Sequence, residues 1–387
     1  MKNLFSNLLF KVFIAIVLGI IFGLYLPESF NRIFATFNAF FGQFLSFAIP
    51  LIIMGLIMPA ISDLGKGAGR LLLLTAAIAY GSTLFSGFMT FFIGSSIFPS
   101  LLESHVNSTA EIAENAKELI PYFSISIPPV LDVMSALVLA FIIGLGLSYQ
   151  ENSTLKPVVK DFQIIIMQVI ENVIVPLLPL FILGIFANMA FSGQVYSILS
   201  VFLNIIGVIF GLHILLLLLQ YGIAGAIVKR NPLRLLMNMM PAYFTALGTQ
   251  SSAATIPVTL EQALKNGVSE KIAGFVIPLC ATIHLSGSIM KITACAMALM
   301  ILHGEPFTFT LFAGFIFMLG IAMIAAPGVP GGAIMAAIGI LQAILGFDEE
   351  MIGLMIALYI AMDSFGTACN VTGDGAIALV VDKITKD

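Results

Sequence analysis

Long apolar stretches constrain the fold of this chain more than any other feature of its sequence. An α-helix needs about 20 apolar residues to cross the hydrocarbon core of a bilayer, and several stretches here reach that length. Only 9% of the 387 residues are charged, against about 25% in soluble domains. Strands of membrane barrels are shorter and alternate apolar with polar residues, which these stretches do not. The sequence therefore predicts an all-α polytopic membrane protein.

Eight of these stretches are predicted to be spanning helices, and two more are interrupted. The eight are residues 8–26, 34–62, 71–98, 126–149, 162–192, 196–228, 272–302 and 351–382. The interrupted stretches cover residues 232–266 and 308–346. Broken apolar segments at matching places in two halves of a chain indicate hairpins of inverted repeats. Since non-helical backbone at membrane depth must be buried or line a cavity, both breaks are candidates for a site.

Basic residues predict the orientation of these helices. They form clusters that alternate along the chain with acidic or uncharged connections, which follows the positive-inside rule. The clusters are Lys2 and Lys11, Lys66 and Arg70, Lys156 and Lys160, Lys229, Arg230 and Arg234, and Lys383 and Lys386. We expect both termini on the cytoplasmic side of a bacterial-type inner membrane. Each interrupted stretch must then enter and leave the membrane on one side.

The last predicted helix carries a polar stripe that lipid does not tolerate. The stripe consists of Asp363, Thr367, Asn370 and Asp374, at i, i+4, i+7 and i+11. At about 100° per residue, these side chains project within roughly 40° of one another. Ionisable groups at mid-bilayer are costly, so they face the protein interior or a watered cavity, where they usually handle ions or a solute. Bonding between helices would explain Thr367 and Asn370, but not two aspartates as well.

A second polar face is predicted on the helix over residues 272–302. His284, Ser288 and Lys291 lie at i, i+4 and i+7 and share one side of that helix. A lysine within a membrane needs a carboxylate partner, and one aspartate of the stripe is expected to supply it. His284 also has a structural alternative, because polar residues in membrane helices often bond to a neighbouring helix.

The breaks of the two interrupted stretches share a composition of small, hydroxyl-bearing and proline residues. The first turns at residues 248–257, which include Ser251 and Ser252, and the second turns at residues 326–333. Serine at such a turn caps the half-helix that follows. The free N–H groups at the start of a half-helix also bind an anion such as a carboxylate, so capping and binding coincide here.

Three motifs resemble those of the dicarboxylate/amino acid:cation symporter family, which includes the glutamate transporters. Residues 249–259 resemble its serine-rich first hairpin, residues 328–332 its second hairpin, and residues 363–374 its eighth helix. The resemblance covers the whole chain in order and spacing. It implies eight transmembrane helices plus two re-entrant helical hairpins, arranged as inverted repeats.

The resemblance also implies an assembly and a mechanism. It implies a homotrimer in which a fixed scaffold supports a transport domain that moves like an elevator. The scaffold would comprise residues 1–70 and 101–195, and the transport domain residues 71–100 and 196–387. The second hairpin would be the gate on the outer side.

Individual site roles follow from the same resemblance. Asp363 would hold the amino group of the substrate, while Asn370 and the serines of the first hairpin would hold its α-carboxylate. The expected substrate-binding residues are Gln250, Ser251, Ser252, Val329, Pro330, Gly331, Ala333, Asp363, Gly366, Thr367 and Asn370. Asp374 would bind a sodium ion together with Asn370, and His284 of the seventh helix is expected beside them.

One departure from the family concerns the substrate. Acidic-substrate members carry an arginine at the position of Gly366, or in the first hairpin at the position of Gln250. That arginine clamps the side-chain carboxylate, and neither residue of this chain can do so. A small neutral amino acid such as serine, threonine or alanine is therefore expected. The alternative within the same class is a dicarboxylate or an acidic amino acid.

Two further departures concern the coupling ion. The family motif Asn-Met-Asp-Gly-Thr is here His-Leu-Ser-Gly-Ser at residues 284–288, which lacks the charged ligand of a second sodium site. Lys291 occupies a position that is normally uncharged, where a tethered ammonium can replace a bound cation. His284 can carry a proton, because histidine titrates close to neutral pH. We expect coupling to fewer sodium ions, to protons or to no ion, and no covalent cofactor.

Two other functional classes share some of these features. An ion channel on the same scaffold would also use polar stripes and a hairpin gate. An intramembrane hydrolase would use the histidine, the serines and the aspartates, but the chain has neither a GxSxG nor an HExxH motif. We expect a transporter rather than an enzyme, with a small-molecule substrate, the lipid bilayer as its surroundings and no nucleic-acid partner.

Overall fold

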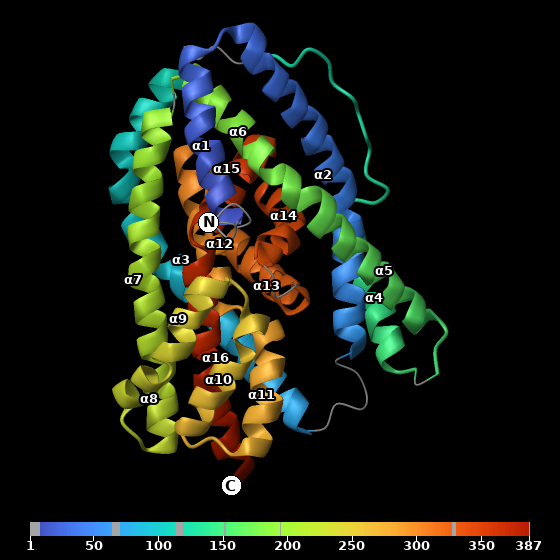
Figure 1. The fold of residues 1–387 in the computed structure, drawn as a ribbon, viewed down its shortest axis with the longest axis vertical. Helices are drawn as coiled ribbons and strands as arrows, with labels where there is room; N and C mark the ends of the chain where they lie inside the picture. The colour runs from blue at the N-terminus through green and yellow to red at the C-terminus, as the bar shows by residue number, and fades with distance from the viewer. Residues whose placement is uncertain are drawn as a thin grey trace.

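The computed structural model describes residues 8–63, 70–113, 119–150, 152–193, 195–326 and 330–386. The regular structure within these ranges is entirely helical (Figure 1). The elements are α1 (Leu8–Tyr25), α2 (Glu28–Asp63), α3 (Arg70–Ala113), α4 (Val133–Ser148), α5 (Leu155–Val169), the π-helix η1 (Ile170–Ile174), α6 (Val175–Phe191), α7 (Val195–Val228), α8 (Pro232–Asn238), α9 (Met240–Thr249), α10 (Ser252–Lys265), α11 (Glu270–Ile283), α12 (Ser286–Leu302), α13 (Phe309–Ala325), α14 (Gly332–Leu345), α15 (Glu349–Ala361) and α16 (Asp363–Lys386).

Several of these helices are long and apolar enough to cross a membrane, as the sequence predicts. Six spans in the described ranges meet this criterion, and the bent pair of α15 and α16 adds a seventh if it forms one span. Helix α4 is shorter than its predicted span, with 16 residues beginning at Val133. Pro128 and Pro129 precede it, and proline disfavours helical backbone in the residue before it. The chain is therefore a multi-pass membrane protein.

The two interrupted stretches form helix–turn–helix units, as the sequence predicts. In the first, α9 ends at Thr249 and α10 begins at Ser252. Gln250 between them is left-handed, with φ of 54°, and this conformation ends α9. In the second, α13 and α14 are joined by a segment that ends at Gly331, also left-handed with φ of 76°. Residues 327–329 of this second turn lie outside the described ranges.

Two helices predicted as continuous are divided, which corrects the prediction. The stretch over 272–302 stops as α11 at Ile283 and resumes as α12 at Ser286. His284 between them has extended backbone, with φ of −107° and ψ of 98°. Serine and glycine follow this break, and both favour helix ends over helix interiors. The stretch over 351–382 bends by 61° between α15 and α16.

Helix α16 lies inside the helical bundle (Figure 1). It contacts α7, α9, α10, α11 and α12, and most of its residues are buried. Helix α12 is buried along nearly its whole length and packs against α3 and α16. Elsewhere in the molecule, α1 packs against α6, and α2 packs against α4, α5 and α6. The polar residues of α12 and α16 therefore meet within protein rather than at a lipid-facing surface.

Candidate functional site

Asp363 begins α16, directly after the bend that separates it from α15. Its Oδ1 lies 3.2 Å from the ammonium Nζ of Lys291 on α12. Its Oδ2 accepts a 2.8 Å hydrogen bond from the backbone N–H of Gly331, at the start of α14. The chain itself thus holds both oxygens of this acid, from two separate elements. Such partners are required, because an unpaired charge in the interior is strongly destabilising.

The ammonium group of Lys291 is enclosed on every side. The residue is 0% exposed, and Nζ donates to the carbonyl oxygen of Met362 at 3.3 Å as well as to Asp363. Nζ also lies 3.8 Å from the centre of the Tyr359 ring, within cation–π range. The predicted need of this lysine for a carboxylate is met, and of the two candidate partners the structure selects Asp363.

Glycine at position 366 makes room for the lysine. A Cβ placed on Gly366 would lie 2.5 Å from Nζ of Lys291, so a larger residue fits only if the lysine moves. The family resemblance puts the arginine of acidic-substrate members at this position. In this chain, the space beside α16 is instead filled by a cation that reaches it from α12.

Asp374, at the far end of the stripe, is paired with His284. Nδ1 of the imidazole lies 2.8 Å from Oδ1 of the carboxylate, and the two side chains are 0% and 1% exposed. With Asp374 ionised, Nδ1 is the nitrogen that carries a proton. Nε2 on the other side of the ring lies 3.1 Å from the hydroxyl of Ser82 on α3.

The break between α11 and α12 separates His284 from Lys291, which the sequence placed on one helical face. His284 is not helical, so its predicted i, i+4, i+7 relationship with Ser288 and Lys291 is wrong. Only Ser288 and Lys291 share α12. As a result, each aspartate of the stripe has its own cationic or protonatable partner.

Polar residues of α3 and α7 extend the contacts of His284. Nε2 of Gln220 donates to the hydroxyl of Ser82 at 3.0 Å and to that of Ser286 at 3.3 Å. The hydroxyl of Ser86 donates to the carbonyl of Ser286 at 2.7 Å. These residues were not predicted as part of the site, since single polar residues in membrane helices usually make bonds between helices. A polar residue inside a long apolar stretch was the signal that could have indicated their role.

Asn370 holds the start of α12. Its Oδ1 accepts a 2.7 Å hydrogen bond from the backbone N–H of Gly287, and its Nδ2 donates to the hydroxyl of Ser288 at 3.1 Å. The first N–H groups of a helix lack intrahelical partners, so this amide caps α12. Thr367, one turn earlier, is also buried. The whole stripe therefore faces the protein interior, as predicted.

The first helix–turn–helix unit touches the start of α16. Nε2 of Gln250 donates to the hydroxyl of Ser364 at 2.8 Å, and both residues are buried. Ser251 is the N-cap of α10, and its Oγ accepts from the backbone N–H of Ala254 at 3.2 Å. Ser252 follows as the first, buried residue of α10. The N-terminal end of α10 thus lies against α16 close to Asp363.

The second unit reaches the site through its turn. Gly331 supplies the N–H that binds Asp363, and Ala333 is buried in the first turn of α14. Pro330 is half-buried beside them. Val329 falls outside the described ranges, so its role in binding stays a prediction.

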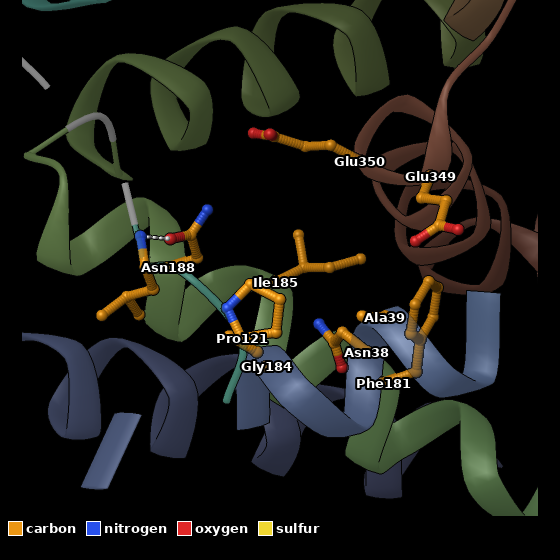
Figure 2. A pocket seen from close by; sticks show the side chains of 11 residues that line it. Asn38, Ala39, Pro121, Phe181, Gly184, Ile185, Asn188, Glu349 and Glu350 are labelled. Carbon is orange, nitrogen blue, oxygen red and sulfur yellow. Dashed lines mark hydrogen bonds between the residues drawn. The ribbon is translucent and has the colours of Figure 1, made fainter. Parts of the chain in front are cut away.

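Two pockets lie away from the polar stripe. One of about 180 Å³ lies between α2, α6 and the start of α15, where Figure 2 shows Asn38, Asn188, Glu349 and Glu350 around it. The other, of about 250 Å³, is mostly apolar and includes Ser82 and Gln220, so it adjoins the contacts of His284. Neither pocket lies between the stripe and the two turns.

Comparison with known proteins gives one family over nearly the whole chain. The family model of the sodium:dicarboxylate symporter family matches residues 8–384. The serine/threonine transporter SstT of Acinetobacter baumannii is 27% identical over 394 aligned positions, which cover 97% of this chain and 96% of the relative. Excitatory amino acid transporter 3 of Mus musculus is 34% identical over 161 positions, covering 41% of this chain and 31% of the relative. An uncharacterized symporter of Haemophilus influenzae is 34% identical over 174 positions, covering 44% and 39%.

Proposed function

Because this chain belongs to the sodium:dicarboxylate symporter family, we propose that it is a secondary active symporter for a small neutral amino acid. Serine, threonine and alanine are the proposed substrates. The named relatives are transporters rather than enzymes, and the long apolar helices agree with a protein that acts within a membrane. Membership in this family also makes sodium coupling the general expectation.

The observation that carries the choice of substrate is the pairing of Lys291 with Asp363 beside Gly366. A second carboxylate on a substrate needs a cation whose charge is not already balanced. The cation in the space beside Gly366 is the ammonium of Lys291, and Asp363 lies 3.2 Å from it. An acidic substrate therefore finds no unpaired cation there for its second carboxylate. The name of the serine/threonine transporter SstT, similar over nearly its full length, supports the same choice.

The amino acid is proposed to bind between α16 and the two turns. Its amino group would contact Asp363, and its carboxylate would contact Asn370 and the N-terminal end of α10 at Ser251 and Ser252. Helix N-termini favour anions through their free N–H groups. Since the backbone N–H of Gly331 binds one oxygen of Asp363, the start of α14 would move away from Asp363 as the substrate enters. This is the behaviour expected of a gate.

The proposed coupling uses fewer sodium ions than in acidic-substrate relatives. Imidazole suits softer metals than sodium, and the partner of Asp374 is the imidazole of His284 at 2.8 Å. One sodium ion at Asp374 and Asn370 would share the Asp374 carboxylate with that imidazole. We propose that His284 carries a proton as an alternative coupling ion.

The proposed elevator divides the helices into two groups. Helices α1, α2 and α4–α6 would form the scaffold, and α3 together with α7–α16 the transport domain. The packing of α1 on α6 and of α2 on α4, α5 and α6 supports the first group. The packing of α16 on α7 and α9–α12, and of α3 on α12, supports the second. We propose a homotrimer in a bacterial-type inner membrane with both termini in the cytoplasm.

Counterflow of labelled serine in proteoliposomes tests the proposal. Vesicles loaded with unlabelled serine should accumulate the label transiently and saturably, which a channel does not do. Serine, threonine and alanine in the outer medium should inhibit this counterflow more strongly than aspartate or succinate. Stronger inhibition by aspartate or succinate would show that the substrate is acidic. Currents without any saturable counterflow would show a channel.

A further inference from the structure

Each oxygen of the Asp363 carboxylate has a donor from the chain. Lys291 of α12 binds Oδ1, and the N–H of Gly331 at the second turn binds Oδ2. The two donors come from elements far apart in the sequence, so the acid connects α12, α16 and the turn before α14. The turn can therefore rest on Asp363 without any contribution from a substrate, provided that Lys291 balances the charge.

The side chain of Lys291 ends in the same chemical group as the substrate. Both the lysine and an amino acid present a primary ammonium group. Asp363 is the proposed partner of the ammonium group of the substrate. Two ammonium groups on one buried carboxylate repel each other, because charges interact strongly where water is excluded. Lysine and substrate should therefore compete for Asp363.

We propose that Lys291 is a tethered substitute for the amino group of the substrate, which holds Asp363 and the start of α14 at Gly331 in place during the return of the unloaded carrier. This inference rests on the proposed function, since it needs an amino acid as cargo. Without the lysine, the unloaded carrier would have to move a buried and unbalanced carboxylate through the membrane, which is strongly unfavourable. With the lysine, loaded and unloaded carriers both present a paired acid to the turn.

Net influx and exchange separate this role from a merely structural one. Net influx requires the unloaded carrier to return, whereas exchange of internal for external serine does not. Lys291→Met should reduce net influx at least about tenfold relative to exchange, both measured in proteoliposomes with labelled serine. It should also tighten serine binding by roughly tenfold, because the competing ammonium is gone.

Two matched controls accompany this variant. Lys265→Met also removes a lysine that is paired with an acid, Glu261 at 2.7 Å, but on an exposed helix face. It should leave the ratio of net influx to exchange at the wild-type value. Gly366→Ala keeps the lysine but pushes its ammonium away from Asp363, so it should lower the ratio in the same direction. Gly274→Ala is its control, because a Cβ there meets open space.

The outcomes are distinguishable. Parallel loss of net influx and exchange in Lys291→Met, or an unchanged ratio, would show that the lysine only supports the fold. If that variant does not fold, the ratio in Gly366→Ala decides by the same criterion. A wild-type protein that exchanges serine but shows no net influx would also overturn the inference, while the proposed function would stand. A wild-type protein that exchanges no amino acid would overturn both.

Discussion

The imidazole Nδ1 of His284 lies 2.8 Å from the carboxylate Oδ1 of Asp374, and both side chains are almost completely buried. The residue that should present an acid to a sodium ion is therefore already engaged by a residue that can carry charge itself. Lys291 has the same relationship to Asp363. Both acids of the α16 stripe thus have partners from the same broken segment, α11 and α12.

Replacing His284 with asparagine should increase the dependence of serine uptake on sodium. The substitution removes the imidazole from Asp374 and restores an oxygen donor at that place. A hydrogen bond to a charged group contributes about 1.5–3 kcal/mol, so the sodium concentration for half-maximal uptake should fall by about tenfold or more. His303→Asn is the control, because His303 bonds only to the carbonyl of Leu299 among the contacts described for its ring. An unchanged sodium titration in His284→Asn would contradict a role of the imidazole in ion coupling.

Arginine at position 366 should shift specificity toward acidic substrates only when Lys291 is also removed. The space beside Gly366 is filled by Nζ of the lysine, so Gly366→Arg alone would force two cations together. In the double variant Gly366→Arg/Lys291→Met, the guanidinium can pair with a side-chain carboxylate in bidentate fashion. Inhibition of serine counterflow by aspartate should then strengthen at least about tenfold relative to inhibition by alanine. If Gly366→Arg alone has the same effect, the lysine does not control this space.

The left-handed conformation of Gln250 predicts a graded effect of substitutions on stability. Gln250→Gly loses the hydrogen bond to Ser364, about 1 kcal/mol, but fits the φ of 54° without strain. Gln250→Val loses the same bond and adds a β-branched side chain in a region that costs roughly 1–2 kcal/mol for residues other than glycine. In detergent, the Gln250→Val variant should therefore unfold at a lower temperature than the Gln250→Gly variant. Ser364→Ala, which removes only the bond, is the control, and equal stability of the two Gln250 variants would contradict the prediction.

The contribution of Asp132 to stability should disappear in acid. Its pKa is lowered, first by the hydrogen bond from the Ser135 hydroxyl and then by that from the Ser135 backbone N–H, at the start of α4. A depressed pKa adds stability above the pKa of the unfolded state, and this is lost as pH falls through the folded-state value. Asp132→Ala should lower Tm at pH 7 by on the order of 2 °C, and the difference should begin to narrow below about pH 4 and close once pH falls below the folded-state pKa. A difference that persists in acid would assign the effect to packing rather than to the charged cap.

Local sequence patterns predicted most of the features that depend on one helix or one turn alone. The inward direction of Asp363 and Asp374 followed from their spacing, because helical periodicity alone decides which side chains share a face. The turns at Gln250 and Gly331 followed from composition, since small and left-handed-tolerant residues mark breaks. Two consecutive prolines also indicated that α4 begins late, although the predicted helix began before them.

Which acid of the stripe pairs with Lys291 and which with His284 could not be predicted. It depends on the break after Ile283, where neither His284 nor Leu285 is a glycine or a proline. That break turns His284 toward Asp374 and leaves Lys291 on α12 to reach Asp363. Ser82 and Gln220 were missed for a related reason. Their role comes from the approach of α3 and α7 to the break, which is a tertiary relationship that no local spacing records.

The sodium dependence of serine uptake by the wild-type protein tests most directly whether residues of the chain take the place of coupling ions at the α16 acids. Uptake into proteoliposomes should be measured across sodium concentrations at fixed membrane potential, with choline replacing sodium. Pairing of both acids within the chain predicts a shallow titration with a Hill coefficient of about one or less. A steep titration, with a Hill coefficient of about two or more, would show that several sodium ions bind despite these pairs.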